Sequence, residues 1–208
     1  MRKTTRFASR VQVLEALVEH RDLTEADMSG LDLSGIELVG VAMAGANLRG
    51  ADLSFCLLAG ADAAGADLSG AQMVGARIKD TNLWRADLSD ADLCGASIKD
   101  THLGGSTLRG TNLAATSIAR CSLYEADLTA ADLTGSSLRQ VDVAGADLSG
   151  AIFSGARSAG LNWARAKAPP AELPLPLPEP VPWLLIVLAC AAGVLLAAAL
   201  RRKARQRS

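Results

Sequence analysis

The sequence predicts an all-β solenoid, a fold in which short repeats wind around one central core. Every fifth residue from Met28 to Phe153 is large and apolar except Ala63, so the chain contains 26 repeats without a slip in phase. The position two residues before each of these central residues is small or modestly apolar, and is most often Ala. Gly commonly closes the unit. A period of five matches neither the helical period of about 3.6 nor the strand period of about 2.0, so each unit must turn a corner.

The repeat consensus is Ala-Asp-Leu-Ser-Gly, which occurs intact at residues 66–70 and 146–150. Over about residues 23–163 this pattern resembles the pentapeptide-repeat family, whose units read Ala-(Asp/Asn)-Leu-x-x. The resemblance implies a right-handed quadrilateral β-helix with four units per coil, or about 6.5 coils for 26 units. It also implies that the central residue and the small residue two before it point into the core. Alternating large and small inward positions can interlock at the packing density of protein interiors.

Residues 1–22 precede the repeats and are expected to cover the first coil. Their apolar residues fall mostly on one side of a helical pattern, which predicts a short helix over about residues 5–20. These apolar residues are Phe7, Val11, Val13, Leu14, Leu17 and Val18. At the other end of the repeats, Trp163 falls in the central phase and is expected to plug the last coil. Such lids matter because an uncovered strand edge invites association with another chain.

The C-terminal part of the chain predicts a membrane anchor. Residues 164–182 are expected to form a Pro-rich linker, in which all seven prolines lie between Pro169 and Pro182 and favour an extended polyproline II spacer. Residues 183–200 then carry no charge over 18 residues, which is enough for a helix to span a bilayer core. Trp183 suits one membrane interface, and the basic tail of residues 201–208 suits the other. We therefore expect a single-pass protein with the lipid bilayer as a partner.

The orientation of this anchor rests on two opposed signals. Five basic residues after the apolar stretch favour a cytoplasmic C-terminus, which would place the solenoid outside. The N-terminal segment, however, lacks the apolar region of a secretion signal, so we expect a cytoplasmic solenoid on a C-terminal tail anchor. The alternative is a surface protein. Residues 177–180 read Leu-Pro-Glu-Pro, and together with the apolar stretch and the Arg cluster they resemble bacterial C-terminal sorting signals of the Pro-Glu-Pro type.

No group of residues in the sequence suggests catalysis. The chain has two histidines, His20 and His102, and neither lies in a metal-ligand or nucleophile motif. The many Asp residues occupy a repeat position, where they are expected to form turns or a solvated face rather than an acid and base pair. We therefore expect neither an enzyme nor a site for a metal or a cofactor.

Unrolling the repeats at twenty residues per coil assigns the outward residues to four faces. Two neighbouring faces are acidic and carry columns of Asp residues, namely Asp67, Asp87, Asp127 and Asp147 on one and Asp32, Asp52, Asp92 and Asp132 on the other. A third face is basic and carries Arg77, Lys79, Lys99, Arg120, Arg139 and Arg157. The solenoid is therefore expected to have two sides of opposite charge.

The fourth face carries two aromatic residues that are candidates for partner binding. This candidate site consists of Trp84 and Tyr124, which lie two coils apart, with Arg85, His102 and Glu125 nearby. Exposed aromatic residues are common interface anchors. Phe55, Leu57 and Ile152 are further outward apolar residues, and they could instead pack beneath a terminal helix or against a second copy of the chain. The sequence thus leaves a homodimer open.

These features favour a non-catalytic, membrane-tethered protein-binding or scaffold module. Its protein partner would be steered by the charged faces and anchored by the aromatic residues. An alternative comes from the family resemblance, because some members mimic the charge and shape of duplex DNA and bind type II topoisomerases. Residues 21–163 contain 18 acidic and 10 basic residues, which agrees with that alternative. Direct binding of nucleic acid is not expected, since only one face is basic.

Overall fold

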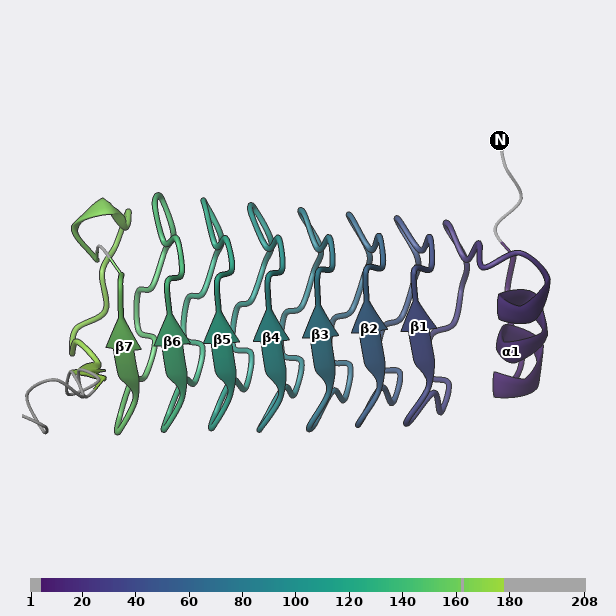
Figure 1. Ribbon diagram of the computed structural model, residues 1–208, viewed down its shortest axis with the longest axis horizontal. Coiled ribbons are helices and arrows are strands. Elements are labelled where there is room, and N and C mark those ends of the chain that lie inside the picture. Colours follow the sequence, from purple (N-terminus) through teal and green to yellow (C-terminus); the bar gives the residue numbers. More distant parts are fainter. Residues whose placement is uncertain (1–4, 162, 178–208) are drawn as a thin grey trace, which may run out of the picture. The chain divides into compact units, whose positions relative to one another are not determined.

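The described residues up to Pro176 form an all-β parallel solenoid of about seven turns with one short N-terminal helix, which confirms the predicted all-β solenoid (Figure 1). This computed structural model describes residues 5–161 and 163–177. The chain divides into two units, Met1–Pro176 and Leu177–Ser208.

One strand from each coil contributes to a single parallel sheet in the order β1 to β8. The strands are β1 Glu37–Val39, β2 Leu57–Ala59, β3 Arg77–Lys79, β4 Ser97–Lys99, β5 Ser117–Ala119, β6 Ser137–Arg139, β7 Arg157–Ala159 and β8 Leu175–Pro176. From β1 to β7, each residue pairs with the residue twenty positions later, as Leu38 does with Leu58. Figure 1 shows these seven strands side by side.

The other sides of each coil keep the same spacing. Isolated parallel bridges join Asp67 to Asp87, Asp92 to Asn112, and Asn82 to His102. Each coil therefore has four paired sides, and the repeat phase read from the sequence carries through the described coils. The corners need a left-handed backbone, which Gly adopts without steric cost, as at Gly70 with φ 64°.

The core is a continuous column of the central residues. All 26 of them are buried, and the most exposed, Phe153, retains only 5% of its accessible surface. Ala63 is also fully buried, although it lacks the bulk of the others. The small positions two residues earlier are buried as well, except Leu31, which is half-buried. The predicted inward pair of each repeat is therefore confirmed.

Several small core positions carry a hydroxyl group, and most of these hydroxyls find a backbone acceptor. The Ser106 hydroxyl donates to the Leu103 carbonyl at 2.7 Å, and the Thr116 hydroxyl donates to the Leu113 carbonyl at 2.7 Å. Ser136 differs, because its buried hydroxyl has no hydrogen-bond partner. A buried polar group without a partner is destabilising, since it has lost its hydrogen bonds to water.

We expect Ser136→Ala to raise the free energy of unfolding by about 1 kcal/mol, because it removes an unsatisfied polar atom and fits the Ala consensus. Chemical denaturation followed by circular dichroism would measure the change. The matched control is Ser106→Ala, which removes a satisfied hydroxyl and is expected to lower stability instead. If both substitutions shifted stability in the same direction, the unsatisfied state of Ser136 would not be the cause.

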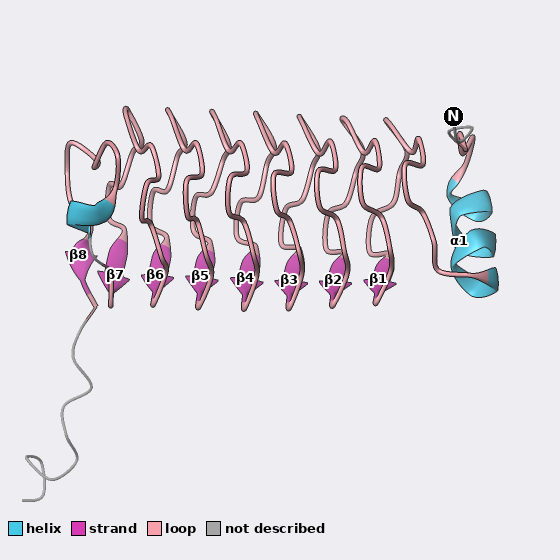
Figure 2. Ribbon diagram, turned by 90° about the horizontal axis from the view of Figure 1, so that it is seen from above, coloured by secondary structure: helices cyan, strands magenta, loops and turns pink. Residues whose placement is uncertain are grey.

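The N-terminal helix α1 spans Arg10–Glu19 and begins later than residue 5, where the sequence placed it. The reason is that the preceding segment pairs with the first coil: Arg6 forms a bridge with Asp27, and the Phe7 N–H donates to the Asp27 carbonyl at 2.9 Å. This pairing keeps the backbone extended before the helix. Figure 2 shows α1 at the β1 end of the solenoid.

The apolar residues of α1 do not share one side, so that part of the prediction is wrong. Val13 and Ala16 are buried against the first coil, which confirms the predicted lid. In contrast, Val11, Leu14 and Val18 are exposed. The helix is therefore apolar on two faces.

The last coil is covered by Trp163 and then by β8. Trp163 lies in a short 3-10 helix, Trp163–Arg165, and its ring packs edge-on against Phe153 with centroids 5.6 Å apart. The Leu175 N–H donates to the Ala156 carbonyl at 2.9 Å, which adds β8 to β7. Residues 164–176 thus belong to the solenoid unit, whereas the sequence placed them in a Pro-rich linker.

The alternating prolines in and around β8 are well suited to the last strand of a sheet. Pro has no N–H, so it fits a strand only where that position faces away from the neighbouring strand. Leu175 uses its N–H to bond to β7, and Pro176 follows it. A strand of this kind pairs along one edge and leaves the other edge poor in donors, which blocks further strand addition.

The predicted transmembrane helix at residues 183–200 and the basic tail at residues 201–208 lie outside the described residues. Within residues 5–161 and 163–177, no helix combines the length and apolar character that a membrane span requires.

Candidate functional site

The structure brings Trp84, His102 and Arg85 into contact on one side of the solenoid. The Trp84 and His102 rings are stacked, with centroids 5.3 Å apart and planes 12° from parallel. The Arg85 guanidinium carbon lies 5.5 Å from the centroid of the Trp84 ring, within the range of a cation–π interaction. We call these three residues, with Gly104 beneath them, the Trp84 platform.

Gly104 makes room for the platform. A Cβ atom at this position would lie 2.5 Å from Cζ3 of Trp84, closer than non-bonded carbon atoms approach. The Trp84 ring therefore extends along the solenoid and covers the backbone of the next coil. Because Gly104 has no left-handed φ, it is required here for space rather than for backbone conformation.

The backbone under the platform is held by hydrogen bonds within its coil and to the neighbouring coils. The Trp84 N–H donates to Oδ1 of Asn82 at 3.1 Å, and the Asn82 side-chain amide donates to Oδ1 of Asp62 at 2.9 Å. The Leu83 N–H donates to the His102 carbonyl at 2.8 Å. The platform is therefore built on a regular ladder, which fixes its aromatic rings at little cost in conformational entropy on binding.

Tyr124 and Glu125 form a separate pair one coil beyond His102. Tyr124 is 42% exposed and makes no ring contact with Trp84 among the described residues. A hydrogen bond to the Glu125 carboxylate, together with its negative charge, raises the pKa of Tyr124. The predicted aromatic site is thus two neighbouring features rather than one stacked cluster.

The eight Asp residues of the predicted acidic faces share one local role. In each, a carboxylate oxygen accepts the backbone N–H two residues later, at 2.9 Å for Asp67 and Asp87. The same bond is made by Asp32, Asp52, Asp92, Asp127, Asp132 and Asp147. Side chains of this type stabilise turns. The acidic columns are therefore a consequence of corner formation as well as a charged surface.

Some of the acidic residues are also neutralised by basic neighbours. Arg109 donates to Asp127 at 3.1 Å, and Lys167 lies 3.5 Å from Asp147. Asp67 and Asp87 have no such ion pair among the described residues. The negative field of this face is therefore concentrated on the coils around residues 67 and 87.

Several of these interactions lower the pKa of a carboxyl group. Hydrogen bonds from the Ser29 hydroxyl and N–H lower the pKa of Asp27, and a hydrogen bond from Arg120 lowers the pKa of Asp100. Bonds from residues two positions later likewise lower the pKa of Asp32 and Asp147. Each group therefore binds its proton more weakly in the folded chain than in the unfolded chain.

Acid is expected to destabilise the solenoid for this reason. The unfolded state binds more protons than the folded state as the pH falls below about 4, so the stabilisation present above that pH is lost progressively below it. Thermal unfolding between pH 7 and pH 2.5 would show a falling melting temperature. In Asp100→Asn the decline is expected to be shallower, because one of the shifted groups is gone. A melting temperature that stayed constant to pH 2.5 would contradict the prediction.

The predicted basic face corresponds to the sheet of β1 to β7, and ion pairs neutralise part of it. Lys79 and Lys99 are direct partners in the register of β3 and β4. Arg120 forms a two-point bond with Asp100 at 2.6 and 2.7 Å, and Lys79 lies 3.3 Å from Asp80. Among the described residues, no ion pair is formed by Arg77, Lys99, Arg139 or Arg157, which keep the positive charge of this face.

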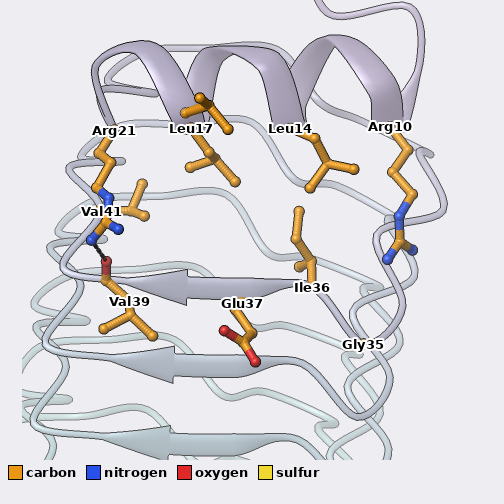
Figure 3. A pocket seen from close by; sticks show the side chains of 10 residues that line it. Arg10, Leu14, Leu17, Arg21, Gly35, Ile36, Glu37, Val39 and Val41 are labelled. Carbon is orange, nitrogen blue, oxygen red and sulfur yellow. Dashed lines mark hydrogen bonds between the residues drawn. The ribbon is translucent and has the colours of Figure 1, made fainter.

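Sequence reasoning missed a groove between α1 and the first coil. Its apolar walls come from Leu14, Leu17 and Val18 on the helix and from Ile36 and Val41 on the coil. Figure 3 shows that Arg10 and Arg21 stand at its two ends. The groove has a volume of about 640 Å³. The spacing of Val11, Leu14 and Val18 by three and four residues was the sequence signal for it.

The comparisons with known proteins agree with the observed fold. A family model for pentapeptide repeats matches eight copies over residues 46–85, 86–123 and 121–157, which is more than half of the chain. Among curated proteins, none matches the chain.

Several solved structures are similar to the chain. HetL, a pentapeptide repeat protein involved in heterocyst differentiation regulation from the cyanobacterium Nostoc sp. Strain PCC 7120, is 30% identical over 73% of this chain and 74% of HetL, with a TM-score of 0.36. Rfr23 from the cyanobacterium Cyanothece 51142 is 18% identical over 74% of this chain and 99% of Rfr23, with a TM-score of 0.41. QnrB1, a plasmid-mediated fluoroquinolone resistance protein, is 21% identical over 68% of this chain and 77% of QnrB1, with a TM-score of 0.43. The five-residue phase, the four-sided coils and the family match together show that this chain belongs to the pentapeptide-repeat family.

Proposed function

We propose that this protein is a non-catalytic, membrane-tethered protein-binding module whose contact surface is the Trp84 platform. The observation that carries the proposal is the Trp84 ring itself, for which Gly104 makes room over the next coil and which stacks on His102 within cation–π distance of Arg85. Trp, Tyr and Arg are the residues most enriched in the energetic centres of protein interfaces. A preorganised group of this kind favours a protein partner.

Charge would orient this partner. Arg85 lies on the platform and Glu125 lies by Tyr124, so the two aromatic features carry opposite charges. A partner that presents an acidic group near the first and a basic group near the second would be held in one orientation. The outward carboxylates of Asp67 and Asp87 accept turn hydrogen bonds, which disfavours their use as an acid and base pair.

The membrane tether rests on the sequence of residues 183–208. An uncharged stretch of 18 residues followed by a basic tail favours a single span. Tethering would restrict the module to partners near the membrane and raise its effective concentration there. We propose that the solenoid lies in the cytoplasm, because the described cysteines Cys56, Cys94 and Cys121 are free, as is usual in a reducing compartment.

The binding role is tested by recovery of partners on the tagged full-length protein from solubilised membranes. Trp84→Ala combined with Tyr124→Ala is expected to lose a partner that the unchanged protein retains. Phe55→Ala is the matched control, because Phe55 also lies over a glycine of the next coil, Gly75, and is 71% exposed. Equal recovery by all three proteins would reject the platform as the binding surface.

The tether and its orientation are tested separately by protease accessibility of tags at the N-terminus and in the Pro-rich segment. Protection of the tags until the cells are lysed would support the cytoplasmic arrangement. Cleavage in intact cells or spheroplasts would instead favour a surface protein with a C-terminal sorting signal. Release of the full chain from membranes by salt alone would reject a spanning anchor.

A second candidate function uses the acidic faces. The Asp67 and Asp87 carboxylates stand on consecutive coils and have no ion pair among the described residues, so they present a row of negative charge. Such a row favours binding to a topoisomerase, an enzyme that normally binds the phosphates of duplex DNA. A gyrase supercoiling assay with the full-length protein tests this function, and inhibition or quinolone protection that is lost in Asp67→Asn with Asp87→Asn would support it.

A further inference from the structure

Helix α1 has an apolar stripe that nothing in the described part of the chain covers. Val11 is 61% exposed, Leu14 is 41% exposed and Val18 is 88% exposed. Their spacing of three and four residues places them on one stripe of the helix. Val13 and Ala16 are meanwhile buried against the first coil. A helix that is apolar on two faces normally lies between two apolar surfaces.

The groove beside this stripe exposes the edge of the sheet. The Leu57 N–H donates to the Ile36 carbonyl and the Gly40 N–H donates to the Ala59 carbonyl, so the even-numbered residues in and beside β1 direct their backbone groups toward β2. Backbone groups alternate in direction along a parallel strand, so the backbone N–H and C=O groups of Glu37 and Val39 point toward α1. The Val39 carbonyl accepts a bond from Arg21 at 3.2 Å. Within the described residues, the N–H groups of Glu37 and Val39 have no such partner.

The two flanks of the stripe carry opposite charges. Glu15 and Glu19 lie along one flank, and both are exposed. The groove lies along the other flank, with Arg10 and Arg21 at its ends (Figure 3). Arg10 donates to the Ser34 carbonyl at 2.6 Å and also lies 3.8 Å from the Asp32 carboxylate. Arg21 is exposed and makes one longer bond, at 3.2 Å to the Val39 carbonyl, so Arg21 is the better partner for an added carboxylate.

We propose that two copies of this chain pair head to head, with the Val11, Leu14 and Val18 stripe of each copy seated in the groove of the other. The two copies are related by a two-fold axis parallel to α1. This axis places the stripe of each copy opposite the groove of the other copy. The same axis brings the acidic flank of each helix against the basic flank of the other. Such an interface is self-complementary, as a symmetric dimer requires.

The charge of the groove favours a second copy over the chain's own N-terminal end. Residues 1–4 include Arg2 and Lys3, whose charge matches that of Arg10 and Arg21 and opposes docking there. The helix of a second copy offers an apolar ridge beside two carboxylates. These carboxylates can accept bonds from Arg21 and from the unpaired N–H groups at the edge of β1.

Site-specific photo-crosslinking of the full-length chain tests the pairing. A benzophenone amino acid in place of Val18 is expected to give a crosslinked dimer of this chain, whereas the same group in place of the exposed Phe55 is expected to give none. Leu14→Asp should abolish the crosslink from position 18, and circular dichroism would show that α1 remains folded. A folded protein that gives no dimer from position 18, or that crosslinks there to a different protein, would overturn the proposal.

Charge reversal tests the orientation of the pair. Glu19→Arg alone and Arg21→Glu alone should each weaken the crosslinked dimer, because like charges then meet across the axis. The double variant should restore it, since each Arg again faces a Glu. An additive loss in the double variant would rule out the parallel arrangement of the two helices. Glu37→Gln should strengthen the dimer, because it removes the carboxylate that lines the groove.

Discussion

Leu88→Ala is expected to lower the free energy of unfolding by about 3 to 5 kcal/mol, which is the upper range for loss of a buried leucine side chain. Leu88 is 1% exposed and lies between Leu68 and Leu108, the central residues on the same side of the neighbouring coils. Neither neighbour can move into the space, because cross-coil hydrogen bonds hold the backbone on both sides. Chemical denaturation followed by circular dichroism would measure the loss.

Leu148→Ala provides the matched comparison. Leu148 belongs to the same side of the solenoid, but beyond it the chain continues through Ala168 rather than another leucine. The capping segment therefore replaces the stacking of one coil leucine on the next on one side of Leu148, and we expect a smaller loss. In a solenoid, stability is approximately a sum of coil terms and nearest-neighbour terms. Equal losses at the two positions would show that the coils do not depend on their neighbours in this way.

Gly104→Ala is expected to remove the Trp84 platform while leaving the coil intact. The added methyl group would lie 2.5 Å from Cζ3 of Trp84, so the ring must leave its place against the coil and lose its stacking with His102. We expect partner recovery to fall to the level of Trp84→Ala, and stability to fall by about 1 to 3 kcal/mol, as for other overpacked sites. Tryptophan fluorescence would report the displaced ring.

A double-mutant cycle isolates this contact. In a Trp84→Ala background, Gly104→Ala is expected to have little effect on stability, because the ring it displaces is absent. The φ of Gly104 lies outside the left-handed region, so the alanine adds no backbone strain of its own. The same loss of stability in both backgrounds would place the cause in the backbone rather than in Trp84.

The repeat phase predicted the core because every fifth residue of the chain takes the same inward position on its side of the coil. No loop interrupts the phase from Met28 to Phe153, so burial could be assigned residue by residue. The ends were harder to predict. The start of α1 depends on the pairing of Arg6 with Asp27, and the docking of β8 depends on Leu175 finding the open edge of β7. Both are contacts between distant segments, which helical periodicity and proline content do not encode.

The candidate site was predicted in part. The sequence placed Trp84, His102 and Arg85 near one another, because twenty residues separate neighbouring positions along a face. It could not predict that Trp84 lies along the solenoid, since that direction depends on Gly104 in the next coil. Phe55 over Gly75 repeats this arrangement. A large outward residue followed twenty positions later by glycine is therefore a pattern that could be sought in related chains.

Because each coil has four sides of five residues, the effect of an insertion or deletion depends on whether its length is a multiple of five or of twenty residues. A gain or loss of twenty residues between Gly70 and Ala71 would change the length of the solenoid and leave every later residue on its present side. A gain of five residues there would also preserve the core, because the inward phase is unchanged. It would, however, turn every later side chain by a quarter of a circle about the solenoid axis. Trp84 would then point in a new direction relative to α1, so the angle between surfaces at the two ends can evolve in quarter turns without loss of the fold.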